Sequence, residues 1–225
     1  EIKENMKTYL DQVYKVFPKG AFEVKYNSKW LRKLKLDNFI KLASNITVQQ
    51  TLARDMFQRR EERGLPIGLH EFLYPLMQGY DSVAMEVDGE VGGNDQLFNM
   101  IVGRDLEKKI LNKDKIVLAT KLLVDKNTGK KMSKSEGNLI ALNDSPQNIF
   151  GKVMRIPDGE SIRTVCELAT EMYNDDYDKF DNYNEFATKW LVQKEKEDHK
   201  SFKEKVAFEL VKMIYSEKEA QKARE

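Results

Sequence analysis

The pattern of apolar residues changes near residue 145, and this change limits the possible folds more than any other feature. Before it, helical periodicities alternate with short buried strands such as residues 116–119. Such alternation predicts an α/β region with an open, mostly parallel sheet. After Ser145-Pro146, a favourable helix start, every pattern is helical. We therefore expect an α/β region over residues 1–142 and a small all-helical domain over residues 143–225.

Local signals predict individual elements within this scheme. Apolar spacing indicates a helix from about Leu69 to Val83, a strand over 87–91 and a helix from Asp95 to about Gly103. Alternation of apolar and charged residues predicts a short strand over 22–26. Capping boxes are predicted at Thr47 with Gln50 and at Ser216 with Glu219.

Composition excludes several classes of protein. The 225 residues are 40% hydrophobic, which argues against wholesale disorder. No apolar run approaches the roughly 18 residues of a membrane span, and no secretory leader opens the sequence. The single cysteine suggests a reducing, cytoplasmic compartment. The net charge of +1 neither supports nor excludes RNA binding.

Tyr74, Gln78 and Asp81 form the first group that can carry chemistry. Their spacing places them on one stripe of the predicted helix, beside apolar residues. A ligand with an ammonium group and a hydroxyl would give this stripe hydrogen-bond partners, because Gln78 and Asp81 can both accept. The competing interpretation is that the stripe simply faces water, and spacing alone leaves the two about equal.

The second group lies between a predicted strand and a predicted helix, in the run Gly92-Gly93-Asn94-Asp95-Gln96. Two glycines allow close approach of a ligand to the backbone, and Asp95 can accept from ribose hydroxyls. By itself the pair of glycines more often marks only a turn.

The third group is a loop from Gly129 to Asn138 that holds three lysines and two hydroxyl side chains. Its ammonium groups can contact phosphate oxygens, and its bracketing glycines allow movement. It is not a Walker A loop, and an inert basic surface loop is the competing interpretation. The two histidines and one cysteine do not have the spacing of a zinc site.

Together the three groups resemble a known family. Residues 131–135 spell KMSKS, the mobile-loop signature of class I aminoacyl-tRNA synthetases. The order of Tyr74, Gln78 and Asp81, then the Gly92–Gln96 run, then KMSKS resembles bacterial-type tyrosyl-tRNA synthetase over nearly the whole chain. Tryptophanyl enzymes share the fold and the lysine loop but not this stripe, so the resemblance favours tyrosine.

The resemblance implies a role for each matching residue. Tyr74 and Gln78 would hold the α-ammonium of tyrosine, Asp81 would accept its phenolic hydroxyl, and Gln96 would lie near its carboxylate and the α-phosphate. The implied ATP-binding residues are Gly92, Gly93, Asp95, Lys131, Met132, Ser133, Lys134 and Ser135. Lys131 and Lys134 would also be catalytic, since they would stabilise the leaving pyrophosphate. ATP would be the co-substrate with Mg²⁺ as its counter-ion, and no protein-bound metal is expected.

The sequence departs from the family pattern at one motif, because H-I-G-H does not occur. We expect the chain to be the second part of a Rossmann-like catalytic domain with its helical domain, lacking the first part and the C-terminal RNA-binding domain, and inactive alone. The implied partners are tyrosine, ATP, tRNA(Tyr) and a second copy bound through residues 65–72, with no membrane. Packing of the apolar residues of 65–72 in the chain's own core is the competing interpretation, at about equal odds. The alternatives are a tryptophan–tRNA ligase and a non-catalytic RNA-binding relative.

Overall fold

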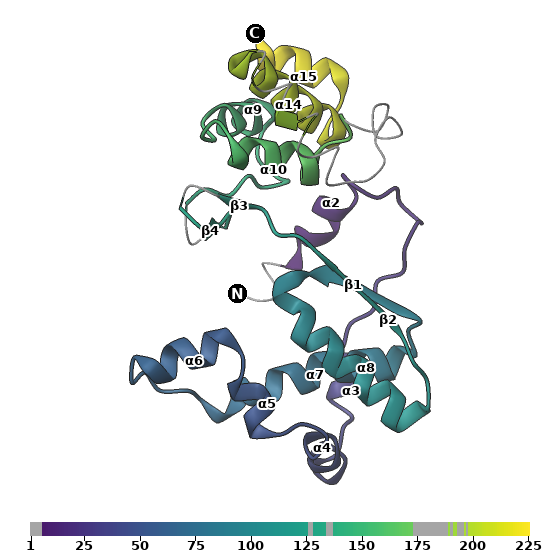
Figure 1. Ribbon diagram of the computed structural model, residues 1–225. Helices are drawn as coiled ribbons and strands as arrows, with labels where there is room; N and C mark the ends of the chain where they lie inside the picture. The colour runs from purple at the N-terminus through teal and green to yellow at the C-terminus, as the bar shows by residue number, and fades with distance from the viewer. Residues whose placement is uncertain are drawn as a thin grey trace. The chain divides into compact units, whose positions relative to one another are not determined.

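The computed structural model describes residues 6–125, 128–133, 137–172, 189, 191–192, 196 and 198–225. It contains two compact units (Figure 1), one formed by Val24–Leu122 and the other by Glu1–Glu23 together with Leu123–Glu225. This division follows the contacts within the chain and does not test the domain boundary expected between residues 142 and 143, which stays a prediction.

The unit Val24–Leu122 combines helices with a two-stranded parallel sheet. β1 pairs with β2 in a register that runs from Gly89 opposite Ile116 to Gly93 opposite Thr120. Helix α7 packs along α8, and α8 contacts both strands. In chain order the elements are α3 (Ser28–Leu31), α4 (Leu36–Ala43), α5 (Val48–Leu52), α6 (Asp55–Glu62), α7 (Leu69–Met85), β1 (Gly89–Gly93), the 3₁₀ turn η1 (Asn94–Gln96), α8 (Leu97–Leu111) and β2 (Ile116–Thr120).

Two glycines, Gly79 and Gly103, lie where helices α7 and α8 approach most closely. A Cβ atom on Gly79 would lie 3.0 Å from Leu106 Cδ1 and 3.1 Å from the backbone nitrogen of Gly103. A Cβ atom on Gly103 would lie 3.4 Å from the Cα atom of Gly79. A Cβ atom on Gly103 would also lie 2.7 Å from Lys115 Nζ and 2.8 Å from Ser82 Oγ. The absence of side chains at both positions therefore lets the helices pack closely at this pair. Around it the helices bury the apolar side chains Leu42, Leu76, Val83, Val102 and Leu106.

The other unit is mainly helical. Helix α14 packs against α9, α10 and α15, and β3 pairs with β4 in an antiparallel hairpin. Its described elements are α2 (Tyr9–Val13), β3 (Val124–Asp125), β4 (Lys130–Lys131), α9 (Pro146–Met154), α10 (Glu160–Ala169), α14 (His199–Ile214) and α15 (Glu217–Arg224). The core is almost wholly apolar and includes Ile149, Val153, Ile162, Val165, Leu191, Phe202, Val206 and Val211.

Lys15 ties the start of the chain to this helical unit. Its Nζ atom donates to the backbone oxygen of Leu142 and to the hydroxyl of Tyr215, both at 2.7 Å. The same ammonium group lies 4.0 Å from the centroid of the Tyr215 ring. A cation held by both a hydroxyl and an aromatic face fixes this contact more firmly than either would alone.

Most local predictions are confirmed, and two are wrong. Residues 116–120 form a strand, β2, but not a buried one, because Ile116 and Leu118 are 74% and 56% exposed in the described residues. The helix expected from Leu69 to Val83 is α7, and the side chains of Thr47, Ser145 and Ser216 each accept the predicted capping hydrogen bond. Residues 22–26 form no strand. Phe22 instead packs its ring against Tyr14, with centroids 5.4 Å apart. Alternation predicts a strand only where a neighbouring strand can pair with it.

Candidate active site

Helix α7 carries Tyr74, Gln78 and Asp81, as the spacing predicted. Their environments differ, because Tyr74 is 52% exposed whereas Gln78 and Asp81 are partly buried. Arg54 interacts electrostatically with Tyr74, and burial lowers the pKa of this guanidinium. The stripe is therefore neither fully buried nor fully exposed to solvent, and its three residues differ in their surroundings.

Asp81 is held by two donors that the sequence did not reveal. Its Oδ1 accepts from the indole Nε1 of Trp30 at 2.7 Å, and its Oδ2 accepts from the Nδ2 of Asn27 at 3.3 Å. Burial raises the pKa of Asp81, and these two hydrogen bonds oppose the rise. An ionised carboxylate has about four acceptor sites, so Asp81 is oriented and still able to accept from a ligand hydroxyl.

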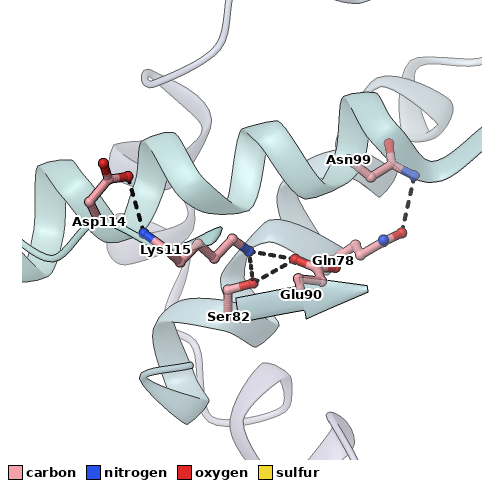
Figure 2. A network of polar contacts seen from close by, with 6 residues as sticks. All are labelled: Gln78, Ser82, Glu90, Asn99, Asp114 and Lys115. Carbon is pink, nitrogen blue, oxygen red and sulfur yellow. Dashed lines mark hydrogen bonds and ion pairs between the residues drawn. The ribbon is translucent and has the colours of Figure 1, made fainter. Parts of the chain in front are cut away.

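Gln78 and Gln96 are joined through Asn99, which the sequence analysis also missed. The Nδ2 of Asn99 donates to the Oε1 of Gln78 and to the Oε1 of Gln96, each at 3.0 Å. Figure 2 shows Asn99 on α8 directed toward Gln78 on α7. The contact brings together two residues of the predicted tyrosine site from separate elements.

A buried ion pair adjoins this group along α7. The Nζ of Lys115 donates to the Oγ of Ser82 at 2.5 Å and forms an ion pair with Glu90 (Figure 2). Ser82 lies one helical turn after Gln78, and the side chain of Lys115 is 0% exposed. Because the crossing glycine Gly103 leaves its Cβ position open, the ammonium group can reach Ser82 there.

The Gly92-Gly93 pair has an internal reason to be glycine. A Cβ atom on Gly93 would lie 2.7 Å from both Asp95 Oδ1 and Leu122 Cδ2. A Cβ atom on Gly92 would lie 3.0 Å from the sulfur of Met100. The chain's own side chains therefore crowd both glycines, whether or not a ligand also approaches them.

The described part of the lysine loop is anchored at both ends. Lys131 lies in β4, and the backbone N–H of Met132 donates to Leu123 O at 2.9 Å. The backbone N–H of Ser133 donates to the side-chain Oδ1 of Asn138 at 2.9 Å. Lys134 and Ser135, the other predicted members, lie outside the described residues.

A cavity of about 320 Å³ adjoins this loop within the helical unit. Apolar side chains, two cations and Asp125 line it, and Ser161 Oγ donates to Asp125 Oδ1 at 3.0 Å. Its lining includes Met132, Leu139, Lys152, Arg155 and Ile156.

Within the residues that the structure describes, no cluster of three or more His, Cys, Asp or Glu has a geometry suited to a metal ion. No helix in those ranges has both the length and the apolar composition needed to cross a membrane.

Comparison with known proteins identifies the class to which this fold and site belong. The sequence model of the family described as tRNA synthetases class I (W and Y) matches residues 1–225. The chain belongs to this family, and its α/β part has the Rossmann-like fold of class I synthetases.

Within that family, curated relatives that are similar to this chain are named for tyrosine. The chain is 48% identical over 158 residues to tyrosine–tRNA ligase 2 of Vibrio cholerae, covering 70% of the chain and 40% of the relative. It is 45% identical over 172 residues to tyrosine–tRNA ligase of Carboxydothermus hydrogenoformans, covering 76% of the chain and 42% of the relative. The chain thus spans about two fifths of the length of these relatives.

Solved structures agree on the fold. Tyrosyl-tRNA synthetase of Archaeoglobus fulgidus, complexed with L-tyrosine, superposes with a TM-score of 0.66 at 21% identity, over 100% of the chain and 75% of that structure. A C-terminally truncated mitochondrial tyrosyl-tRNA synthetase of Coccidioides posadasii gives 0.62 at 20% identity, over 97% of the chain and 64% of that structure.

Proposed function

We propose that this chain forms part of a tyrosine–tRNA ligase, a cytoplasmic enzyme that activates tyrosine with ATP and transfers it to tRNA(Tyr). The observation that carries the proposal is Asp81, a partly buried carboxylate already oriented by Trp30 and Asn27. It keeps acceptor capacity for a phenolic hydroxyl, one helical turn from Gln78. The names of relatives at 45–48% identity support the same choice of amino acid.

The proposed reaction needs alignment rather than a protein base. The tyrosine carboxylate attacks the α-phosphorus of ATP, the bond to the bridging oxygen breaks, and pyrophosphate leaves with the electron pair. A ribose hydroxyl at the 3′ end of the tRNA then attacks the tyrosyl carbonyl and releases AMP. Positioning the reactants and stabilising phosphate charge supply most of the acceleration in such a site.

The side chains divide these tasks between them. In this proposal the hydroxyl of Tyr74 and the amide oxygen of Gln78 hold the ammonium group, and Gln96 contacts the carboxylate. Gly92, Gly93 and Asp95 bind the adenosine end of ATP.

The lysine loop binds the phosphates of ATP. Lys131 and Lys134 contact the β- and γ-phosphates, which arrive with Mg²⁺ as counter-ion, and Met132, Ser133 and Ser135 complete the loop. Loop contacts that strengthen in the transition state raise turnover rather than affinity.

Selection against phenylalanine follows from Asp81. Burial already disfavours its charge, so a ligand that excludes water without donating a hydrogen bond leaves the carboxylate poorly solvated. The loss of a hydrogen bond to a buried charged group corresponds to about 1.5–3 kcal/mol, or roughly ten- to a hundredfold in affinity.

The test uses a chimera in which the 172-residue segment that matches the Carboxydothermus enzyme replaces its counterpart there. The chimera should catalyse tyrosine-dependent ATP–pyrophosphate exchange, and Asp81→Asn should reduce the preference for tyrosine over phenylalanine at least about tenfold. Asp88→Asn is the matched control, since that side chain is 98% exposed. A chimera that prefers tryptophan, or an Asp81→Asn variant with unchanged preference, would contradict the proposal.

We further expect no exchange from the 225-residue chain by itself, because its sequence contains no H-I-G-H. Exchange at the rate of the chimera would refute this expectation.

The dimer is proposed through residues 65–72. Leu65 and Leu69 are 49% and 78% exposed, which suits a contact with a second copy. Phe72 serves its own chain, since its ring stacks on Phe57 with centroids 5.1 Å apart. Sedimentation of the chain should give a dimer that Leu69→Lys converts to a monomer, whereas a monomer at every concentration would exclude this interface.

A further inference from the structure

We propose that Asn99 is a positioning residue that fixes the orientation of the Gln78 and Gln96 amides and so makes the site select a ligand with a free carboxylate. The proposal rests on the function proposed above and adds a residue that does not itself touch the substrate. Its basis is a buried side chain that contacts both glutamines.

The geometry leaves Asn99 no spare donor. Its side chain is 1% exposed, and its Nδ2 donates to the two glutamine oxygens at 3.0 Å each. A side-chain amide carries two N–H groups, so both are used. Turning either glutamine amide over would set its NH₂ group against the NH₂ group of Asn99.

Fixing the two oxygens decides what the glutamines offer to a ligand. With Oε1 of Gln96 held by Asn99, its Nε2 is the atom left to donate, and a carboxylate is the complementary acceptor. The Oε1 of Gln78 keeps a second lone pair, which can accept from an ammonium group. One buried amide therefore prepares both glutamines for the two ends of an α-amino acid.

The side-chain oxygen of Asn99 gives further support for this positioning role. Its Oδ1 is buried, and it has no hydrogen-bond partner among the residues described. An unpartnered buried acceptor is unfavourable, and leucine would fill a similar space without it. The packing of α8 alone does not call for an asparagine there.

The experiment compares tyrosine with tyramine, which lacks the carboxylate, by calorimetric titration of the chimera described above. Asn99→Asp removes the donors and places an acceptor against the glutamine oxygens, and Asn99→Leu removes both functions. Both variants should lower the ratio of tyrosine to tyramine affinity at least about tenfold. The tyrosine-to-phenylalanine ratio should stay within about twofold, because Asp81 is untouched.

Asn45→Asp is the matched control, because Asn45 Nδ2 also donates two hydrogen bonds, to the backbone oxygens of Lys41 and Leu42. Asn45→Asp should leave the ratio of tyrosine to tyramine affinity unchanged. Equal weakening of tyrosine and tyramine by the Asn99 variants, or no change in their ratio, would overturn the proposal. A parent chimera without tyrosine preference would refute the proposed function itself, and this inference with it.

A ligand-free measurement covers the case in which both variants fail to fold. In the isotope-labelled 225-residue chain, NMR couplings across hydrogen bonds should connect Asn99 Nδ2 to the side-chain carbonyl carbons of Gln78 and Gln96. Couplings that instead begin at the glutamine nitrogens would mean the opposite orientation and would sink the proposal.

Discussion

The two units of the chain bury different kinds of side chain. The helical unit packs apolar residues such as Ile162 and Val206, both 0% exposed, and the polar side chains buried in its described part are hydroxyls, those of Ser161, Thr164 and Thr170. The unit with α7 and α8 buries Asn99, Glu107 and Lys115 within or beside its apolar cluster. Burial of polar groups is costly unless each finds a partner. The interior of the unit that holds the proposed tyrosine site is therefore less favourable for folding than that of the helical unit, because it contains buried amide and charged side chains.

Glu107 illustrates that unfavourable interior. Both of its carboxylate oxygens are buried, and neither has a hydrogen-bond partner in the described ranges. Burial raises the pKa of this carboxyl, and the charge of Lys115 opposes the rise. Since a raised carboxyl pKa makes folding less favourable as pH increases, Glu107 is a source of instability at neutral pH.

The largest expected effect comes from breaking the buried ion pair. Lys115→Met leaves Glu90 without its cation, and we expect the free energy of unfolding of this unit to fall by about 3–5 kcal/mol. Urea unfolding followed by Trp30 fluorescence in a Trp190→Phe background reports on this unit. Adding Glu90→Gln should recover part of the loss, whereas a loss below about 1 kcal/mol for Lys115→Met would show that the pair is weak.

A comparable truncation in the helical unit tests whether the units are energetically separate. Ile162→Ala removes a fully buried side chain and should lower stability by about 2–4 kcal/mol. In urea unfolding, the midpoint of the transition followed by circular dichroism should move to a lower urea concentration. The midpoint followed by Trp30 fluorescence should stay nearly unchanged. A Trp30 transition that moves by the same amount would contradict the division into two units.

Helix caps give a smaller, paired test. Thr47 caps α5 in one unit and Ser216 caps α15 in the other, and each accepts from a backbone N–H three residues on, at 3.1 and 3.3 Å. Replacing either by alanine should cost about 1 kcal/mol. Thr47→Ala should shift only the unfolding transition followed by Trp30 fluorescence. Ser216→Ala should shift only the transition followed by circular dichroism. If each variant instead shifted the other transition, the two units would not be energetically separate.

The smallest effect is a pH dependence at the Arg60–Glu71 ion pair. The hydrogen bonds from Arg60 and from the Gly68 backbone lower the pKa of Glu71 to about 2. A lowered carboxyl pKa stabilises the fold above the ordinary value near 4.5, and this stabilisation is lost as the pH falls toward 2. Glu71→Gln should flatten the Trp30 stability curve slightly between those values; an unchanged slope would show that the pair contributes nothing.

The sequence was sufficient where the signal is local. The bounds of α7, the three caps and the helical second unit follow from spacing and from capping chemistry within a few residues. The contacts that define the site are not local, since Trp30 lies 51 residues before Asp81 and Gln78 lies 21 residues before Asn99. No periodicity encodes such pairs, because they depend on how elements pack. The strand predicted over residues 22–26 is absent for the same reason.

The crossing of α7 and α8 at Gly79 and Gly103 bears on protein engineering. Amino-acid specificity would ordinarily be altered at the side chains that face the ligand, such as Asp81. The spacing between Gln78 and Asn99, however, is set by two positions that have no side chain at all. A methyl group at Gly79 would press on α8 at Leu106, Val102 and the Gly103 backbone, and one at Gly103 would displace Lys115 Nζ from Ser82. Libraries aimed at new substrates should therefore hold both glycines constant.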